Sequence, residues 1–213
     1  MMGRLSESDR FNLEKQLVFY MSYHHDKINQ WIHLVCIWPI LITAIIMTAE
    51  TNAFVEPPRG LAENSFGKLL VFNLSAVVAV IYMIWYIVLD PRAGSLGAVL
   101  VFASYLFANW LAQNAPSLFG VSAWVIALPI HLVAWTLQFI GHGVYERRKP
   151  ALLDSLDQAI ITAPMFVLLE VLFAAGYRPN LYRRVMAQVE INVAAFHGEK
   201  FLREHAPLLA PGA

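Results

Sequence analysis

The sequence predicts an all-α membrane protein: a polytopic bundle of about four transmembrane helices, with a re-entrant or interfacial segment and amphipathic terminal helices. Of its 213 residues, 58% are hydrophobic and 14% are charged, whereas soluble domains carry about 25% charged residues. The mean hydropathy is +0.54. Several uncharged runs have about the 20 residues that a helix needs to cross the hydrocarbon core of a bilayer. These features exclude a disordered chain and disfavour an ordinary soluble enzyme.

Four uncharged runs give the four predicted spans. They cover residues 31–49, 69–89, 95–113 and 119–141. Between the second and third spans, Asp90-Pro91 predicts a tight turn. Between the third and fourth, residues 114–118 predict a short uncharged loop.

A fifth apolar run, residues 159–175, is shorter and contains Pro164 and Glu170. Basic residues flank it on both sides, so a full crossing would put one of these clusters on the wrong side of the membrane. We therefore expect a re-entrant or interfacial pair of half-helices there.

The two ends of the chain predict amphipathic helices. In residues 9–25, Leu13, Leu17, Tyr20 and His24 recur at helical spacing on one face. Residues 180–205 carry a similar stripe, which predicts a helix on the cytoplasmic membrane surface. The stripe of the second helix contains Tyr182, Val185, Val189, Val193 and Phe196. No repeat or linker interrupts the chain, so we expect one integral membrane domain over residues 1–213.

The distribution of basic residues predicts the orientation. If the N-terminus is cytoplasmic, thirteen of the fifteen Lys and Arg residues lie inside, and Arg59 and Lys68 lie outside. Such a bias follows the positive-inside rule and places both termini in the cytoplasm. Because fifteen basic residues balance fifteen acidic ones, no positive excess favours binding to nucleic acid.

Histidines are the chemically informative residues. The predicted topology brings four of them to one layer at the cytoplasmic boundary: His24, His25, His33 and His142. Ionisable groups at this depth are costly and usually functional. The other three histidines have simpler explanations: His131 is expected to be satisfied inside the bundle, and His197 and His205 to face solvent. The single cysteine, Cys36, is expected to be a small core residue.

Helix geometry limits which histidines can share a metal ion. On an unbroken helix, His25, Asn29 and His33 fall on one face, and His24 points away from His33. A break at Asp26, which is suited to cap a new helix, would let His24 join His33. If the fourth helix continues past Gly143, then Gln138, His142 and Glu146 lie on one face, with Glu146 either as a ligand or as the acceptor of a histidine ring N–H.

Several function classes can use such a cluster. Imidazoles with open coordination positions beside them are typical of oxygen-using iron enzymes. A di-iron membrane desaturase would need about eight histidines in paired clusters, and this layer has four. The alternative is a non-enzymatic membrane scaffold or transporter with a histidine site for metal or protons. Against it, the ionisable groups lie at one boundary instead of along a path through the bilayer.

Two segments also resemble a known family, the 2-hydroxy fatty acid dioxygenases. They are YHHDKINQWIH at residues 23–33 and QFIGHGVYERRKPALLDSLDQAIITAPMF at residues 138–166. The resemblance extends over most of the chain, from FYMSYHH at residues 19–25 to EVLFAAGYRP at residues 170–179. The middle of the chain, around the second and third spans, adds little to it.

The resemblance implies an iron(II) enzyme of fatty acid α-oxidation in sphingoid-base breakdown, acting at the endoplasmic reticulum membrane, or at the inner membrane of a bacterial source. It would use O2 to shorten a 2-hydroxy fatty acid by one carbon. The substrate would chelate iron through its carboxylate and hydroxyl and supply the electrons. The residues that the resemblance implies are three ligands, His24, His33 and His142, with His25, Asn29 and Glu146 nearby. Among the cations that follow, Arg147, Arg148 and Lys149 are candidates for holding the substrate carboxylate.

Overall fold

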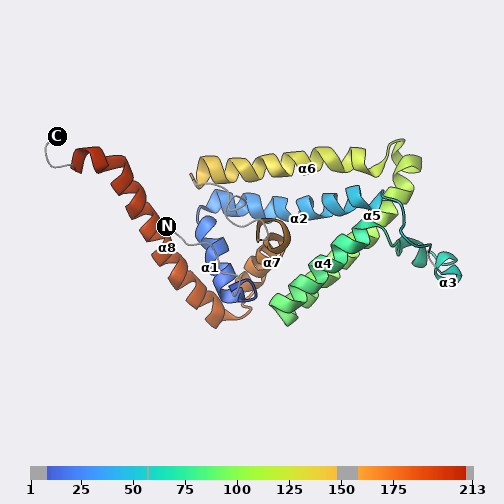
Figure 1. Ribbon diagram of the computed structural model, residues 1–213, viewed down its shortest axis with the longest axis horizontal. Helices are drawn as coiled ribbons and strands as arrows, with labels where there is room; N and C mark the ends of the chain where they lie inside the picture. The colour runs from blue at the N-terminus through green and yellow to red at the C-terminus, as the bar shows by residue number, and fades with distance from the viewer. Residues whose placement is uncertain (1–8, 57, 148–157, 210–213) are drawn as a thin grey trace.

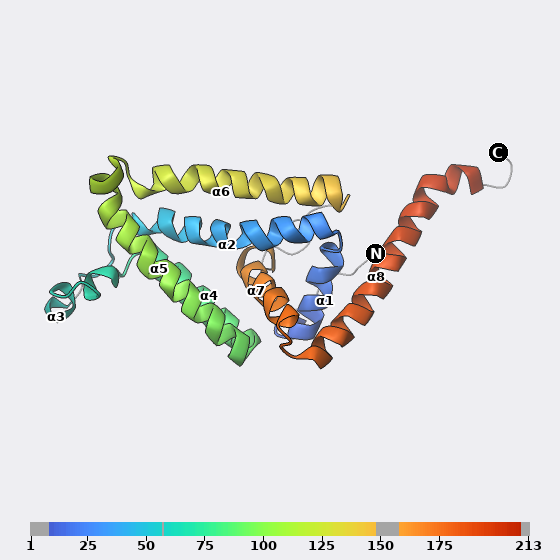
Figure 2. The same ribbon diagram turned by 180° about the vertical axis from the view of Figure 1, so that it is seen from behind.

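The computed structural model describes residues 9–56, 58–147 and 158–209. Every regular element in these ranges is helical, which confirms the predicted all-α class. Figure 1 shows α2 and α6 lying side by side, α4 and α5 crossing beside them, and α8 leading away from the rest. Figure 2, from behind, shows α7 among α1, α2 and α5.

Three segments are long and apolar enough to cross a membrane. They are α2 (Lys27–Ala49), α5 (Pro91–Phe119) and Ala123–Tyr145, which comprises α6 (Ala123–Ile140) and the turn η3 (Gly141–Tyr145). A fourth candidate is a bent pair, Ile160–Ala174 with Pro179–Glu199, whose halves meet at 114°. The number agrees with the expected four, but the members differ from the prediction.

The second predicted span, residues 69–89, is wrong at its start. Its helix, α4 (Leu74–Leu89), has only 16 residues, or about 24 Å, whereas the hydrocarbon core is about 30 Å thick. The side chain of Asn73 explains the late start, because it accepts hydrogen bonds from the backbone N–H groups of Ser75 (3.1 Å) and Ala76 (3.4 Å). An asparagine in this position ends the extended segment and begins the helix.

The predicted loop at residues 114–118 is also wrong, because α5 continues through it to Phe119. Two polar side chains bond back to their own helix: Asn114 to the carbonyl of Trp110 at 2.7 Å, and Ser117 to that of Asn114 at 2.8 Å. Such bonds satisfy the hydrogen-bonding groups of short polar side chains inside a helix, so these residues do not require a loop. The helix stops at Gly120, whose φ of 72° is left-handed.

The tight turn at Asp90-Pro91 is confirmed. Asp90 caps α5 by accepting from the backbone N–H groups of Arg92 and Ala93, and Pro91 occupies the first turn of the helix. The hairpin of α4 and α5 is closely packed, since a Cβ added at Gly94 would lie 1.9 Å from the carbonyl oxygen of Tyr86. Only glycine fits there.

The packing of α6 against α2 depends on small side chains. The buried positions of α6 include Ala123, Ala127 and Ala134, while most other positions of this helix are exposed. Small residues allow two helix backbones to approach closely in a membrane protein. This antiparallel pair brings the C-terminal end of α6 beside the N-terminal end of α2 (Figure 1).

Both amphipathic helices form, but they pack against each other. In α1 (Leu13–Tyr23) the predicted stripe, including Leu17 and Tyr20, is buried. The long helix α8 (Pro179–Leu209) buries a stripe that includes Val185 and Val189. Because this stripe lies against α1, α8 is not simply a helix on the membrane surface. Tyr182 lies off the stripe and is 40% exposed.

The fifth run forms a central element. Residues Gln158–Thr162 make a π-helical turn, η5, and α7 (Ala163–Ala174) follows. Most of α7 is buried, with Phe166 and Leu169 fully so. It contacts α1, α2 and α5. The expected pair of half-helices within residues 159–175 is instead one buried helix after a π-helical turn, and the sharp bend of 114° comes later, between α7 and α8.

Candidate metal centre

Three histidines from separate elements meet at the end of the α2–α6 pair. His24 follows α1, His33 lies in the second turn of α2, and His142 lies in η3. One ligand atom of each lies within 4.8 Å of the others, and all three side chains are buried. The ring centroids are 4.2 Å apart for His24 and His33, and 4.8 Å apart for each of the other two pairs.

Hydrogen bonds to main-chain carbonyls orient two of the rings. His24 Nδ1 lies 2.6 Å from the carbonyl oxygen of Tyr20, and His33 Nδ1 lies 2.9 Å from that of Asn29. Since a carbonyl only accepts, each Nδ1 must carry the proton. The Nε2 atom of each ring is then the unprotonated nitrogen, which is the form that binds a metal.

The break between α1 and α2 lets His24 face His33. Asp26 caps α2 by accepting from the backbone N–H groups of Ile28 (2.8 Å) and Asn29 (3.1 Å), as expected from its place in the sequence. Gln30 of α2 also stabilises this junction, because its side-chain amide donates to the main-chain carbonyl of His24 at 2.7 Å.

His142 lies on a π-helical turn, which was not predicted. The backbone N–H of Glu146 bonds to the carbonyl of Gly141 at 3.0 Å, five residues earlier. The expected face shared by Gln138, His142 and Glu146 assumed a continuous α-helix, and the π turn changes this spacing. Single π turns are frequent at functional sites.

The contacts of Glu146 differ from the expected role. Its carboxylate accepts from the backbone N–H groups of His25 (3.2 Å) and Asp26 (2.9 Å), and from the side-chain amide of Asn29 (3.1 Å). The ring N–H groups of His24 and His33 bond to carbonyls instead. Glu146 therefore holds the start of α2 and does not bond to these two rings.

Four of the remaining predicted residues are exposed or lie outside the described ranges. The side chain of His25 is exposed and lines a different cavity. Arg147 is exposed, with a left-handed φ of 51°. Arg148 and Lys149 lie outside the described residues. Of the predicted neighbours, the structure thus brings Asn29 and Glu146 to the histidines and turns His25 away.

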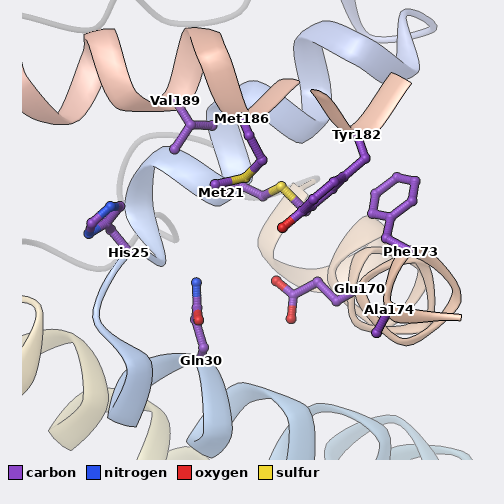
Figure 3. Close-up of a pocket in the computed structure, with 9 residues that line it drawn as sticks. All are labelled: Met21, His25, Gln30, Glu170, Phe173, Ala174, Tyr182, Met186 and Val189. Carbon is purple, nitrogen blue, oxygen red and sulfur yellow. The ribbon is translucent and has the colours of Figure 1, made fainter. Parts of the chain in front are cut away.

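The cavity beside His25 lies between α1, α2, α7 and α8. It has a volume of about 240 Å³, and Figure 3 shows Glu170 of α7 pointing into it opposite Tyr182 and Met186 of α8. On the side of the histidines, Tyr20 of α1 stacks on His24 with ring centroids 4.2 Å apart.

Sequence reasoning missed Tyr20 and Gln30 as neighbours of the site. Tyr20 lies one helical turn before His24 and was assigned to the apolar stripe of α1. The four-residue spacing of an aromatic residue and a histidine was the available signal. The contact of Gln30 depends on the break at Asp26, because it reaches back across the junction.

The other histidines are satisfied or exposed, as expected, where the structure describes them. His131 Nδ1 lies 2.8 Å from Thr43 Oγ1, and Trp135 donates to His131 Nε2 at 3.0 Å. His197 is exposed. The side chain of His205 lies outside the described part of the chain. Cys36 is buried, in agreement with a core role.

The three histidines fit a transition-metal ion. Imidazole nitrogens suit zinc, copper, iron and nickel, and the three rings leave coordination positions for other ligands. Two metal–nitrogen bonds of about 2.1 Å span at most ~4.2 Å, so a shared ion would draw the rings slightly inward. The donor set alone does not select one metal, since imidazole serves all four.

Comparison with known proteins adds to this geometry. The sequence profile of the family described as 2-hydroxy-palmitic acid dioxygenase Mpo1-like matches residues 11–175. The chain belongs to the Mpo1-like family. This Mpo1-like chain is also 31% identical to the 2-hydroxy-palmitic acid dioxygenase MPO1 of Saccharomyces cerevisiae over 180 residues, which cover 84% of this chain and 91% of the relative. No solved structure matches it.

The family match covers the part of the Mpo1-like chain that builds the centre. Residues 11–175 contain His24, His33 and His142 and run from α1 to α7. The range ends before α8 and the exposed His197. His197 therefore lies outside both the cluster and the matched range, and His205 lies outside the matched range.

Proposed function

We propose that this chain is an iron(II)-dependent dioxygenase that removes one carbon from long-chain 2-hydroxy fatty acids. The observation that carries the proposal is the buried cluster of His24, His33 and His142, with ligand atoms within 4.8 Å of one another. Membership of the Mpo1-like family supports the reaction class, because the yeast relative is named a 2-hydroxy-palmitic acid dioxygenase.

Iron(II) is the metal that we propose for the cluster. Bound iron would supply the one-electron chemistry toward O2 that protein side chains lack. The protein contributes oriented ligands: the carbonyls of Tyr20 and Asn29 fix two rings with Nε2 unprotonated. Burial of the three rings limits the access of water to the site.

The substrate class follows from the number of oxygens that it offers. A 2-hydroxy acid carries a carboxylate and a hydroxyl on adjacent carbons, so it can fill two positions that three histidines leave open. Oxidation by one O2 to a fatty acid one carbon shorter, CO2 and water balances in atoms. The substrate gives up four electrons and O2 takes four, so no external reductant is needed.

The basic segment after η3 is our proposed partner for the substrate carboxylate. Arg147 directly follows Glu146 and is exposed, and Arg148 and Lys149 extend the positive charge in the sequence. For the compartment, we propose the endoplasmic reticulum membrane, or the inner membrane of a bacterial source, with the site and both termini facing the cytoplasm. The bias of thirteen basic residues to that side supports this orientation.

The proposed reaction predicts strict dependence on the 2-hydroxyl group. The protein, reconstituted in membranes and loaded anaerobically with iron(II), would be given O2 with 2-hydroxypalmitate, palmitate or 3-hydroxypalmitate at equal membrane loading. We expect mass spectrometry to show pentadecanoate from 2-hydroxypalmitate and little product from the other two acids. Equal turnover of palmitate would reject the two-oxygen mode of binding and indicate a hydroxylase.

A further inference from the structure

The antiparallel helices α2 and α6 are tied together at both ends by carboxylates. At one end, Glu50, which follows α2, accepts from the backbone N–H of Trp124 at 3.3 Å, at the start of α6. At the other end, Glu146, which follows η3, accepts from the backbone N–H groups of His25 and Asp26, just before α2. In each case a carboxylate faces the positive end of a helix dipole, which is favourable.

The two ties differ in what lies beside them. Glu146 is four residues after His142, and its carboxylate bonds to the backbone of His25, which follows His24 directly. It also accepts from Asn29 Nδ2 at 3.1 Å, and the main-chain carbonyl of Asn29 accepts from the ring of His33. One carboxylate thus connects the segments that carry all three histidines.

Asn29 has little freedom to move away from this contact. Its side chain is fully buried, and a Cβ added at Gly141 would lie 2.4 Å from its Oδ1 atom. Glu146 on one side and the backbone of Gly141 on the other therefore fix the amide. A displacement of Glu146 would release Asn29, and with it the carbonyl that orients His33.

We propose that Glu146 is a positioning residue that sets the spacing of the three histidines through Asn29 and the backbone at residues 25–26. The ring N–H groups of His24 and His33 donate to main-chain carbonyls and not to Glu146. The inference rests on the proposed metal site. It assigns Glu146 to the geometry of metal binding and not to the reaction itself.

Cobalt(II) binding tests this role without any turnover. Metal-free protein in detergent would be titrated with Co²⁺, followed by the visible absorption of the bound ion, for wild type, Glu146→Ala and Glu146→Gln. We expect Glu146→Ala to bind Co²⁺ about 10- to 100-fold more weakly, which is the usual cost of losing a partner behind the ligands. Glu146→Gln keeps an acceptor oxygen and should fall between Glu146→Ala and wild type.

Glu50→Ala is the matched control, because it removes the equivalent tie between the same helices at the end far from the histidines. It should bind Co²⁺ as wild type does. Wild-type affinity in Glu146→Ala, or equal weakening in Glu50→Ala, would overturn the positioning role while leaving the metal site intact. Absence of Co²⁺ binding by the wild type would overturn the metal site and this inference together.

Discussion

The partners of each ring decide what a histidine can do in this protein. His24 and His33 each give one nitrogen to a main-chain carbonyl and keep the other. His131 has both nitrogens engaged, with Thr43 and with Trp135. Its Nε2 accepts from an indole N–H and is therefore not available to a metal. Residue type alone does not distinguish these cases, whereas the position in the bundle does.

Gly141 is the residue at which the smallest change should disturb the centre. In Gly141→Ala the new Cβ would lie 2.4 Å from Asn29 Oδ1, so the Asn29 amide must leave its present position, which would disturb its hydrogen bond to Glu146. We expect about 1–3 kcal/mol of lost stability from overpacking and at least tenfold weaker metal binding. Thermal unfolding and a metal titration would measure the two effects. Gly143→Ala, where a Cβ has open space, should change neither, and equal effects of both variants would contradict the argument.

Among the helices, the sequence predicts a boundary correctly where a side chain caps the backbone N–H groups of the residues that follow it. The cap at Asp26 and the turn at Asp90-Pro91 could be predicted for this reason. The late start of α4 at Asn73 followed the same rule but was hidden within an uncharged run. The contact of Glu146 with α2 could not be predicted, because its partners lie more than a hundred residues away in the sequence.

Asp90 also joins two helix junctions. Its carboxylate accepts from the Tyr177 hydroxyl (2.9 Å) and the Arg178 guanidinium (2.6 Å), which follow α7, while it caps α5. Burial alone would raise the pKa of Asp90, but these bonds and the backbone N–H groups together lower it. The contact holds the α4–α5 turn against the α7–α8 turn.

Asp90→Asn should weaken this junction. An amide keeps the shape but loses the charge, and we expect a loss of about 2 kcal/mol, a usual value for hydrogen bonds to a charged group; the half-exposed Arg178 adds little as an ion pair. A lowered folded pKa means that the contribution is present above the ordinary pKa of about 4 and is lost as the pH falls through the folded value. Thermal unfolding at pH 7 should separate the variant from wild type. A gap between the two proteins that widens as the pH falls would contradict this sign.

For the whole molecule, the contact of Asp90 with Arg178 brings together two segments that the basic-residue pattern assigned to the cytoplasmic side. The C-terminal end of α2, away from His33, leads to α3 (Arg59–Ala62), which lies at the end of the molecule away from α1 and α8 (Figure 1). The structure thus separates Arg59 from the histidine end along the length of α2. The orientation of the chain in a real membrane stays a prediction.

Cysteine labelling tests this orientation. Lys27 begins α2 and Arg59 begins α3, beyond the other end of α2; both are exposed, and the native Cys36 is buried. In sealed vesicles of known sidedness, we expect a membrane-impermeant thiol reagent to label Lys27→Cys only from the cytoplasmic side and Arg59→Cys only from the other. Labelling of both from one side would contradict the predicted topology.

Much of the candidate site could be predicted because its ligands lie near charged segments at the ends of long apolar runs. Such runs and charges determine depth and sidedness, which brought His24, His33 and His142 to one layer before any contact was known. The exposure of His25 could not be predicted in the same way. It depends on the residues at which α1 ends and α2 begins, because the non-helical residues between them set the directions in which His24 and His25 point.

Iron content per chain is the most direct test of the central claim, a three-histidine metal centre. Anaerobically loaded and desalted protein would be measured by elemental analysis for wild type, His142→Ala and the exposed control His197→Ala. The account predicts about one iron per chain in wild type and His197→Ala, and almost none in His142→Ala, which loses one of the three proposed ligands. A His142→Ala protein that retains one iron per chain would contradict the account.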